Sequence, residues 1–332
     1  MIRSLLRLCV FLMVPGALAF AQTGNSVVNL PSSKQLTVPT PGHVGSTNSF
    51  PVTMVLSPDG RYAALLNDGH GTQETLGHQS IAVLNLATNQ IADFPDSRLP
   101  EDAHQSYFIG LAFSSDGKHL YASVGSLTDP TGARAANTGN GIAVYSFAQG
   151  KVAPEKFIPI PPQALPTGKT LAVGLTAPPH SAIPYPAGMA LISDGGHDKL
   201  LIANNLSDNV VLLDVASGKI LQTFDLSTNE LVPSSFPYTV VATRDGRRAW
   251  CSLWNASQVA ELDLTSGRVT GWSKLKQPQD PLTPGSHPTA MLLSPDEKTL
   301  YVALSNLDQV AEVSTSDGTV TALLSTASPA QK

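Results

Sequence analysis

The chain has 332 residues, of which 42% are hydrophobic and 14% are charged, and its formal net charge is −5 at pH 7. This composition is typical of a globular protein with a sizeable core and excludes a disordered chain. The acidic balance also argues against binding to a phosphate backbone, which requires clustered Lys and Arg, so no nucleic acid partner is expected.

The first 21 residues are typical of a secretory signal peptide. Arg3 and Arg7 form a basic start, an apolar run over 8–14 follows, and small residues precede two cleavage sites, after Ala19 and Ala21. The apolar run is too short to span a membrane. We therefore expect a periplasmic or secreted protein, in which removal of Arg3 and Arg7 reduces the 20 basic residues to 18 against 25 acidic ones.

Residues 22–50 form an N-terminal segment with one predicted strand, 34–38. Such a strand can pair with the last strands of the chain and so close a ring of sheets. A plain linker fits this segment almost as well.

Residues 51–332 carry a degenerate five-fold repeat. Each copy has an apolar run that ends in Asp-Gly or a close variant, with the aspartates at Asp59, Asp116, Asp194, Asp245 and Asp296, spaced 57, 78, 51 and 51 residues apart. Each copy continues through three more short runs rich in Val, Ile, Leu and Tyr and bounded by turn residues, which is typical of strands. Four strands repeated at this period predict an all-β fold, a β-propeller of four-stranded blades.

One copy carries a family resemblance. Residues 201–220, Leu-Ile-Ala-Asn-Asn-Leu-Ser-Asp-Asn-Val-Val-Leu-Leu-Asp-Val-Ala-Ser-Gly-Lys-Ile, resemble the repeat of the YVTN, or YncE-like, β-propellers, and 301–306 and the Ser-Pro-Asp-Gly turn match the same pattern. The resemblance covers about residues 51–325 and implies the fold of lactonase-type propellers. The chain is also similar to the propeller half of bacterial propeller–phosphoesterase proteins. These resemblances imply a fold and not an activity.

The number of blades differs from what the resemblance implies. Five four-stranded repeats are visible, whereas the family has about seven blades and propellers in general range from about four to eight. The chain is either a small ring or lacks two blades. We favour a truncated chain, because residues 325–332 do not resemble a closing strand.

The longest connections identify one face of the propeller as the candidate site. They span 67–79, 125–141, 159–185, 229–236 and 277–287, and each joins the second strand to the third or one blade to the next. The alternation of strand direction places all of them on one face, which we call the long-loop face. Loops on a rigid scaffold concentrate binding residues, although insertions are also simply tolerated there.

The rim of the long-loop face supplies the candidate binding residues. They are Asn67, Asp68, His70, His104, Tyr107, Asn205, Phe236, Trp254, Asn255, His287 and Asn306. Asn and Asp at strand ends also satisfy turn backbones, which accounts for most of them. Trp254 and Phe236 are more informative, because aromatic side chains at a polar rim suit a small organic or glycan ligand.

No catalytic residue, metal site or cofactor is predicted. The sequence lacks the nucleophile elbow, the zinc-protease pair, the P-loop and the dinucleotide-binding glycines, and its eight histidines are scattered rather than spaced as ligands. We therefore expect a non-enzymatic exported propeller that binds a small molecule, a glycan or a protein on its long-loop face. The alternatives are the recognition half of a phosphoesterase system, or a lactonase-type hydrolase that would use Asp68, His70, His104 and His287.

Overall fold

The computed structural model describes residues 26–29, 35–38, 47–48, 50–69, 79–99, 105–135, 137–277 and 284–326. The chain divides into two compact units, Met1–Gly45 and Ser46–Lys332. In the first unit, β1 (Ser26–Asn29) pairs antiparallel with β2 (Gln35–Val38). The predicted strand at 34–38 is therefore present as β2, and its role in closing a ring stays a prediction.

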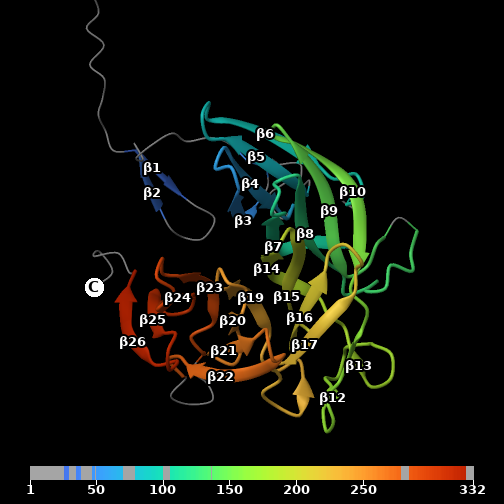
Figure 1. Ribbon diagram of the computed structural model, residues 1–332, viewed down its shortest axis with the longest axis vertical. Helices are drawn as coiled ribbons and strands as arrows, with labels where there is room; N and C mark the ends of the chain where they lie inside the picture. The colour runs from blue at the N-terminus through green and yellow to red at the C-terminus, as the bar shows by residue number, and fades with distance from the viewer. Residues whose placement is uncertain are drawn as a thin grey trace, which may run out of the picture. The chain divides into compact units, whose positions relative to one another are not determined.

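The second unit is a β-propeller of five four-stranded antiparallel blades, which confirms the predicted all-β fold class (Figure 1). Blade 1 contains β3 (Pro51–Leu56), β4 (Tyr62–Asn67), β5 (Ser80–Asn85) and β6 (Gln90–Pro95). Blade 2 contains β7 (Ser106–Phe113), β8 (His119–Gly125), β9 (Gly141–Ala148) and β10 (Lys151–Pro159). Blade 3 contains β14 (Pro186–Asp194), β15 (His197–Asn204), β16 (Asn209–Asp214) and β17 (Ile220–Asp225).

The last two blades repeat this pattern at the C-terminal end of the described chain. Blade 4 contains β19 (Pro237–Ala242), β20 (Arg248–Leu253), β21 (Gln258–Asp263) and β22 (Arg268–Lys274). Blade 5 contains β23 (Pro288–Leu293), β24 (Thr299–Leu304), β25 (Gln309–Ser314) and β26 (Val320–Ser325). Among the residues just described, no helix is long and apolar enough to cross a membrane. The expectation that two blades are missing stays a prediction.

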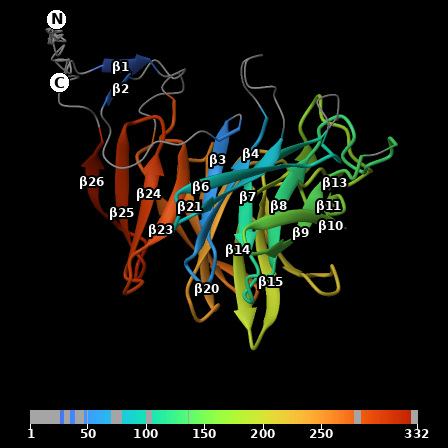
Figure 2. The same ribbon diagram turned by 90° about the horizontal axis from the view of Figure 1, so that it is seen from above.

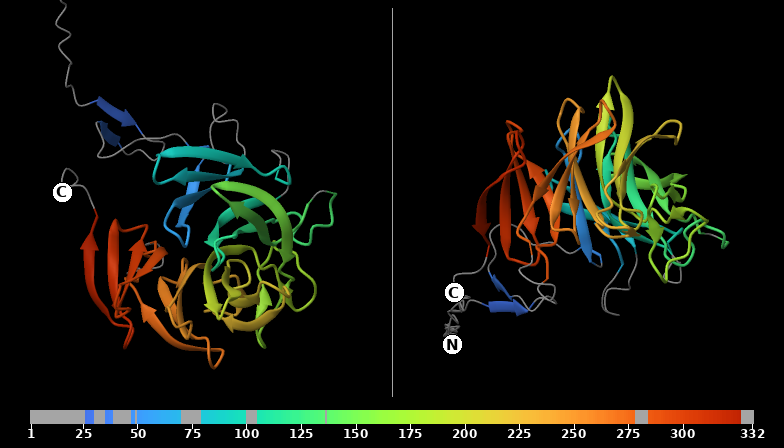
Figure 3. Two further views of the ribbon diagram at one scale, coloured as in Figure 1. Left: turned by 45° about the horizontal axis from the view of Figure 1, so that its top comes forward. Right: turned by 90° about the horizontal axis from the view of Figure 1, so that it is seen from below.

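The strands of each blade pair in chain order, with the first strand innermost. The five innermost strands contact one another in the order β3, β7, β14, β19, β23, so the blades follow one another around an axis (Figure 3). Every first-to-second turn therefore lies on one face. The connections between second and third strands and between blades lie on the other face, opposite the tip of the β14–β15 hairpin in the side view (Figure 2).

Four of the five predicted Asp-Gly turns share one hydrogen-bonding pattern. In blades 1, 2, 4 and 5 the turn aspartate accepts hydrogen bonds from the Ser or Thr hydroxyl two residues earlier and from the backbone N–H two residues later. These bonds lower the pKa of the four carboxyls, which are those of Asp59, Asp116, Asp245 and Asp296.

Asp194 also precedes the first-to-second turn of its blade, as predicted, but this turn is of a different type. β14 continues through Asp194, which pairs with His197 across a two-residue turn. Gly195 and Gly196 occupy that turn with φ of 57° and 86°. Two consecutive positive φ angles are what a type I′ hairpin turn requires, and glycine adopts them without steric cost. Blade 3 therefore ends in an extended hairpin on this face.

The hydrophobic core lies between successive blades rather than at one centre. Successive residues of a second strand point alternately toward the preceding blade and the following blade. Leu200 in blade 3 therefore packs against blade 2, and the adjacent Leu201 packs against blade 4. Four clusters fill the four junctions in this way. Cys251 is fully buried in the junction of blades 3 and 4, as a small hydrophobe rather than a reactive thiol, and burial raises the pKa of its thiol.

Candidate functional site

Two of the long connections on the long-loop face are fixed to each other by backbone pairing. Within the connection from blade 2 to blade 3, β11 (Gln163–Ala164) pairs with β13 (Ser181–Ala182). In the same connection, β12 (Thr170–Leu171) pairs in parallel with β18 (Leu231–Val232), which belongs to the connection from blade 3 to blade 4. These insertions therefore form small sheets rather than irregular loops.

Four of the five innermost strands begin at a proline, and an aromatic residue or a histidine directly precedes that proline. The pairs are Phe50-Pro51, Tyr185-Pro186, Phe236-Pro237 and His287-Pro288, and the first residue of each has a positive φ, between 47° and 55°. Non-glycine residues rarely adopt this conformation, and where they do it is frequently at binding sites. The sequence prediction included Phe236 and His287 but missed Phe50 and Tyr185. The recurring dipeptide before each inner strand is the signal that could have found them.

The backbone of each of these residues is bonded to the end of its own blade's second strand. The carbonyl of Phe236 accepts a hydrogen bond from Trp254 N at 3.0 Å, and that of His287 accepts one from Ser305 N at 3.2 Å. The carbonyl of Tyr185 is bonded in the same way by the N–H of Asn205. The repeat therefore brings the side chains that precede a first strand next to those that follow the second strand.

A buried carboxylate fixes the loop that carries Phe236. Asp208, in the turn between β15 and β16, is fully buried. Its two oxygens accept hydrogen bonds from the backbone N–H and the hydroxyl of both Ser234 and Ser235, at 2.5 to 3.1 Å, and from Phe236 N at 3.0 Å. In blade 4 the equivalent position is Ser257, whose hydroxyl accepts a bond from Ser286 N, one residue before His287. These contacts hold the conformations of Phe236 and His287.

Three predicted residues form a continuous aromatic cluster across blades 4 and 5. The ring centroids of Phe236 and Trp254 are 6.4 Å apart, and those of Trp254 and His287 are 4.0 Å apart, both with edge-to-face geometry. All three side chains are partly exposed. We call Phe236, Trp254 and His287 the aromatic cluster. It is a rigid and partly apolar surface at the edge of the long-loop face.

A second aromatic group joins blades 2, 3 and 4. The ring of Phe108 lies 5.6 Å from that of Tyr185 and 5.9 Å from that of Tyr238. Burial raises the pKa of both tyrosine hydroxyls, so both are neutral at physiological pH. Sequence reasoning missed this group, because its members come from three blades and share no local motif.

The predicted asparagines at the rim connect neighbouring backbone segments. The side-chain amide of Asn205 donates to Pro237 O, that of Asn255 to Ser234 O, and that of Asn306 to Gly285 O, at 2.9 to 3.2 Å. Each bond joins the end of a second strand to the segment that begins an inner strand. Asn255 and Asn306 remain exposed. Their hydrogen bonds therefore support the loops beside the aromatic cluster.

Three of the remaining predicted residues are buried in blades 1 and 2. Asn67 is buried and its amide donates to Ser80 Oγ at 3.0 Å, and Asp68 is buried beside it. Tyr107 is also buried, so it is not the rim residue that was expected. His70 and His104 lie outside the described residues.

The hydroxyl of Tyr107 belongs to a buried polar network between blades 1 and 2. It lies 2.5 Å from the hydroxyl of Tyr145, which donates to Asp96 at 2.5 Å. Arg98 forms an ion pair with the same carboxylate at 2.7 Å. Burial raises the pKa of Asp96, but the hydrogen bonds from Arg98 and Tyr145 outweigh it and leave that pKa below its usual value.

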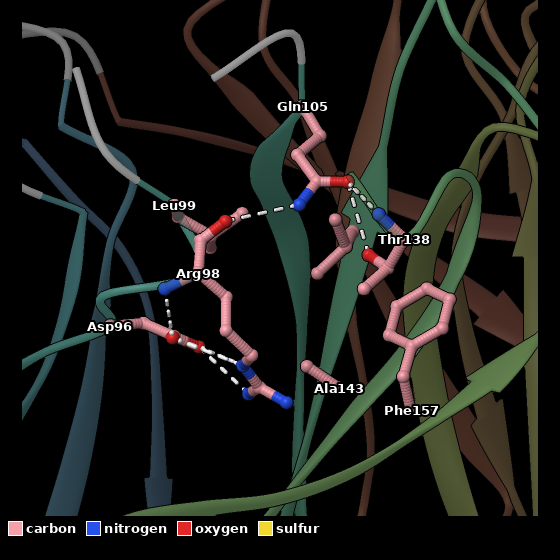
Figure 4. Close-up of a pocket in the computed structure, with 8 residues that line it drawn as sticks. Asp96, Arg98, Leu99, Gln105, Thr138, Ala143 and Phe157 are labelled. Carbon is pink, nitrogen blue, oxygen red and sulfur yellow. Dashed lines mark hydrogen bonds and ion pairs between the residues drawn. The ribbon is translucent and has the colours of Figure 1, made fainter. Parts of the chain in front are cut away.

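Figure 4 shows a small cavity that is lined by Asp96 and Arg98 of this network and by Gln105. The side-chain oxygen Oε1 of Gln105 accepts hydrogen bonds from Thr138 N and Thr138 Oγ1. The side-chain nitrogen Nε2 of Gln105 donates a hydrogen bond to the backbone oxygen of Arg98. Each of these polar side chains therefore has partners within the protein. The network joins the connection between blades 1 and 2 to the connection between β8 and β9, which is a structural role.

The aromatic cluster has the chemistry of a binding surface more than that of a reactive centre. Partial burial lowers the pKa of His287 below its ordinary value of 6.5, so its imidazole is neutral at pH 7. Within the described ranges, no group of three His, Cys, Asp or Glu side chains is placed to hold a metal ion. A neutral imidazole, an indole and a phenyl ring together suit a flat, partly apolar ligand.

Comparisons with known proteins give a fold. No protein-family model and no curated protein matches the chain. Among solved structures, a protein from Lactobacillus plantarum is similar with a TM-score of 0.58 and 14% identity, over 92% of this chain and 80% of that one. A periplasmic gluconolactonase from Pseudomonas aeruginosa has a TM-score of 0.56 and 18% identity, over 84% and 73%. Virginiamycin B lyase from Staphylococcus aureus has a TM-score of 0.54 and 16% identity, over 84% and 71%.

These similarities confirm that the chain has a β-propeller fold of the lactonase type, as its repeat implied. At such low identity they establish the fold alone.

Proposed function

We propose that the protein is a non-enzymatic binding scaffold that uses the aromatic cluster on its long-loop face to hold a small organic or glycan ligand. The observation that carries this proposal is the contact of Phe236, Trp254 and His287, which come from two blades and stay partly exposed. Flat apolar rings beside polar groups are the usual lining of sugar and small-molecule sites.

The surroundings of the aromatic cluster support binding because they fix it in place. Asp208 and Asn255 both bond to the segment Ser234–Phe236. A surface that is already ordered loses little conformational entropy when it binds, which favours affinity.

The proposal is tested by replacing an aromatic side chain inside the cluster and, as a control, a tryptophan outside it. A glycan array and a small-molecule panel are screened first, and the tightest binder becomes the probe for titration. Trp254→Ala and Phe236→Ala should each weaken the probe's Kd about 10-fold or more, which is typical of aromatic anchors. Trp272→Ala is the control, because Trp272 is also exposed but lies on the outermost strand β22. Unchanged affinity in both cluster variants would refute the proposal.

The second candidate function is a hydrolase or lyase, favoured by the structural similarity to a gluconolactonase and a virginiamycin B lyase. The neutral imidazole of His287 could then act as a general base. Gluconolactone and virginiamycin B serve as test substrates, and the metal content of the purified protein is measured alongside. Replacing Asp68, His70 and His104 together leaves the aromatic cluster intact and should therefore leave probe binding mostly unchanged under the scaffold proposal. Loss of a measured turnover, or of a stoichiometric metal, in that variant would favour the enzyme.

We also propose that the protein acts outside the cytoplasm. The support is the order of basic, apolar and small residues over 1–21, which lie outside the described part of the structure. One structurally similar protein is a periplasmic gluconolactonase.

A further inference from the structure

A cavity of about 260 Å³ lies between blades 2 and 3 on the face that carries the first-to-second turns. Its lining comes from the Asp-Gly turn of blade 2, from β8 and β10, from the start of β15 and from the turn between β16 and β17. This face is opposite the long-loop face, so the cavity is separate from the aromatic cluster. Its volume is below the range of most drug-sized sites and suits a smaller ligand.

Most ionisable side chains of the lining already have a partner close to them in the chain or on the neighbouring strand. The carboxylates of Asp116 and Asp214 accept hydrogen bonds from their own turns. His119 pairs with Glu155 at 3.3 Å. Asp198 is the lining carboxylate that has no such bond within its own turn. The ionisable residues of the lining on strands and turns are Asp116, His119, Tyr121, Lys156, His197, Asp198 and Asp214.

Asp198 departs from the charge pattern of the repeat. Its backbone carbonyl accepts a hydrogen bond from Val215 N, at the start of the turn that follows the third strand. The residue that accepts the equivalent bond is basic in every other blade, and these residues are Arg61, Lys118, Arg247 and Lys298. Blade 3 therefore places a negative charge where the other four blades place a positive one.

The side chain of Asp198 is only partly satisfied by the protein. Its Oδ2 accepts a hydrogen bond from Ser115 N at 3.0 Å, across the junction with blade 2. Its Oδ1 is buried and accepts no hydrogen bond from the described residues. Because a buried carboxylate oxygen without a donor is costly, this position favours a ligand that brings a positive charge.

The hydroxyl of Tyr121 is a second polar group without a partner beside the cavity. Tyr121 is 3% exposed, and its ring packs in the apolar cluster between blades 2 and 3. Among the described residues, its hydroxyl has no hydrogen-bond partner, although Tyr121 lines the cavity. Burial raises the pKa of this hydroxyl, and the negative charges of Asp198, Asp116 and Glu155 raise it further. The neutral hydroxyl therefore lies in a region of negative potential.

We propose that this cavity binds a small organic cation of the primary alkylammonium class. An ammonium group has three N–H donors and no acceptor, which suits a phenolic oxygen that can accept a bond and a carboxylate whose charge is not compensated. A metal ion suits the cavity less well, because no three His, Cys, Asp or Glu side chains in the described ranges are placed to hold one.

Ligand-observed NMR tests the proposal with three four-carbon probes of different charge, n-butylamine, n-butanol and butyrate. At pH 8, above the ordinary pKa of imidazole groups, n-butylamine should bind with a millimolar Kd and the other two at least about 10-fold more weakly. Tyr121→Phe keeps the buried ring and removes only the hydroxyl, so it should raise the Kd of n-butylamine about 3-fold or more. Asp198→Asn should raise it about 10-fold or more, because it removes the charge.

The control is Asp225→Asn, which removes an exposed carboxylate of blade 3 that does not line the cavity and should bind n-butylamine like the unmodified protein. Circular dichroism checks that each variant folds, and Tyr121→Phe alone decides the matter if Asp198→Asn unfolds. The proposal is overturned if n-butylamine binds no more tightly than n-butanol or butyrate. Unchanged n-butylamine affinity in the folded cavity variants, or an equal loss in Asp225→Asn, overturns it as well.

Discussion

At the scale of single residues, Asp208 shows how the propeller positions its candidate site. A buried carboxylate is stable only when its oxygens are fully hydrogen-bonded, and Asp208 accepts five such bonds from Ser234, Ser235 and Phe236. The sequence could not predict this role. Asp208 sits in an ordinary turn, and its partners lie 26 to 28 residues further along the chain.

We expect Asp208→Ala to destabilise the protein by about 3 kcal/mol, because it leaves several buried N–H and O–H donors without an acceptor. The free energy of unfolding in urea measures the effect. Asp225→Ala is the matched control, since the Asp225 carboxylate also accepts bonds from a serine, Ser227, but is exposed. Its loss should cost under about 0.5 kcal/mol. Equal losses in the two variants would contradict the assigned role of Asp208.

His287 gives a prediction for pH. Its pKa in the folded protein is lowered by burial, whereas the unfolded chain has the ordinary value of 6.5. The unfolded state therefore binds more protons as the pH falls below 6.5, and stability declines in that range. The native protein should lose more thermal stability between pH 7 and pH 5 than His287→Gln, which has no imidazole to protonate. Parallel melting temperatures for the two proteins across this range would show that His287 is not responsible.

At the scale of elements, the innermost strands approach one another closely at their bulges. β7, β14, β19 and β23 each have a register shift shortly after their first residues. At this point a Cβ on Gly110 would lie 2.3 Å from the carbonyl oxygen of Ala187 in the next blade. The backbone of one blade thus leaves no room for a side chain on its neighbour.

We expect Gly110→Ala to destabilise the protein by about 2 kcal/mol, since the clash is with backbone and can be relieved only by moving two blades apart. Gly271→Ala is the control. Gly271 lies on β22, the outermost strand of blade 4, and its Cβ would meet a side-chain atom, the Glu261 carboxylate oxygen, at 3.3 Å rather than backbone. Chemical denaturation of the two variants compares them directly, and a tolerated Gly110→Ala would mean that the strands can separate at no cost.

Local signals predicted the strands well and the irregular elements poorly. Apolar runs bounded by Asp-Gly and other turn residues located the four strands of each blade, because the pattern repeats in every blade. The Asp194-Gly195 dipeptide located the first-to-second turn of blade 3 correctly, but it gave no sign that Gly195-Gly196 makes a different type of turn. The pairing of β12 with β18 joins two connections that are far apart in the chain, and the sequence of neither connection indicates it.

At the scale of the whole molecule, the repeat determined which residues of the candidate site could be predicted. Trp254 and His287 were found because the ends of second strands and the starts of first strands meet in every blade. Tyr107 was placed by the same rule and is buried, because Tyr145 and Asp96 provide it with a polar partner inside the junction of blades 1 and 2. The position of a residue in the repeat thus predicts which side chains lie near it. Whether its own side chain is exposed depends on the residues of the neighbouring blade.

The last prediction concerns the export of the whole chain. A secreted propeller should need no disulfide, and Cys251, the single cysteine after residue 21, is fully buried and therefore protected from oxidation. Placing a charge in the apolar run, as in Phe11→Asp, should stop export, because this run must enter an apolar environment. Asn25→Asp, beyond both cleavage sites, should export normally.

Mass spectrometry of protein recovered from the periplasm or the medium identifies its first residue and so shows whether residues 1–21 were removed. The expected product begins at Phe20 or Gln22, which corresponds to cleavage after Ala19 or Ala21. Its folding can be checked by the same urea transition as the full chain, since residues 1–21 precede every strand of the propeller. An intact Met1 on exported protein, or unchanged export of Phe11→Asp, would show that these residues do not act as a signal peptide.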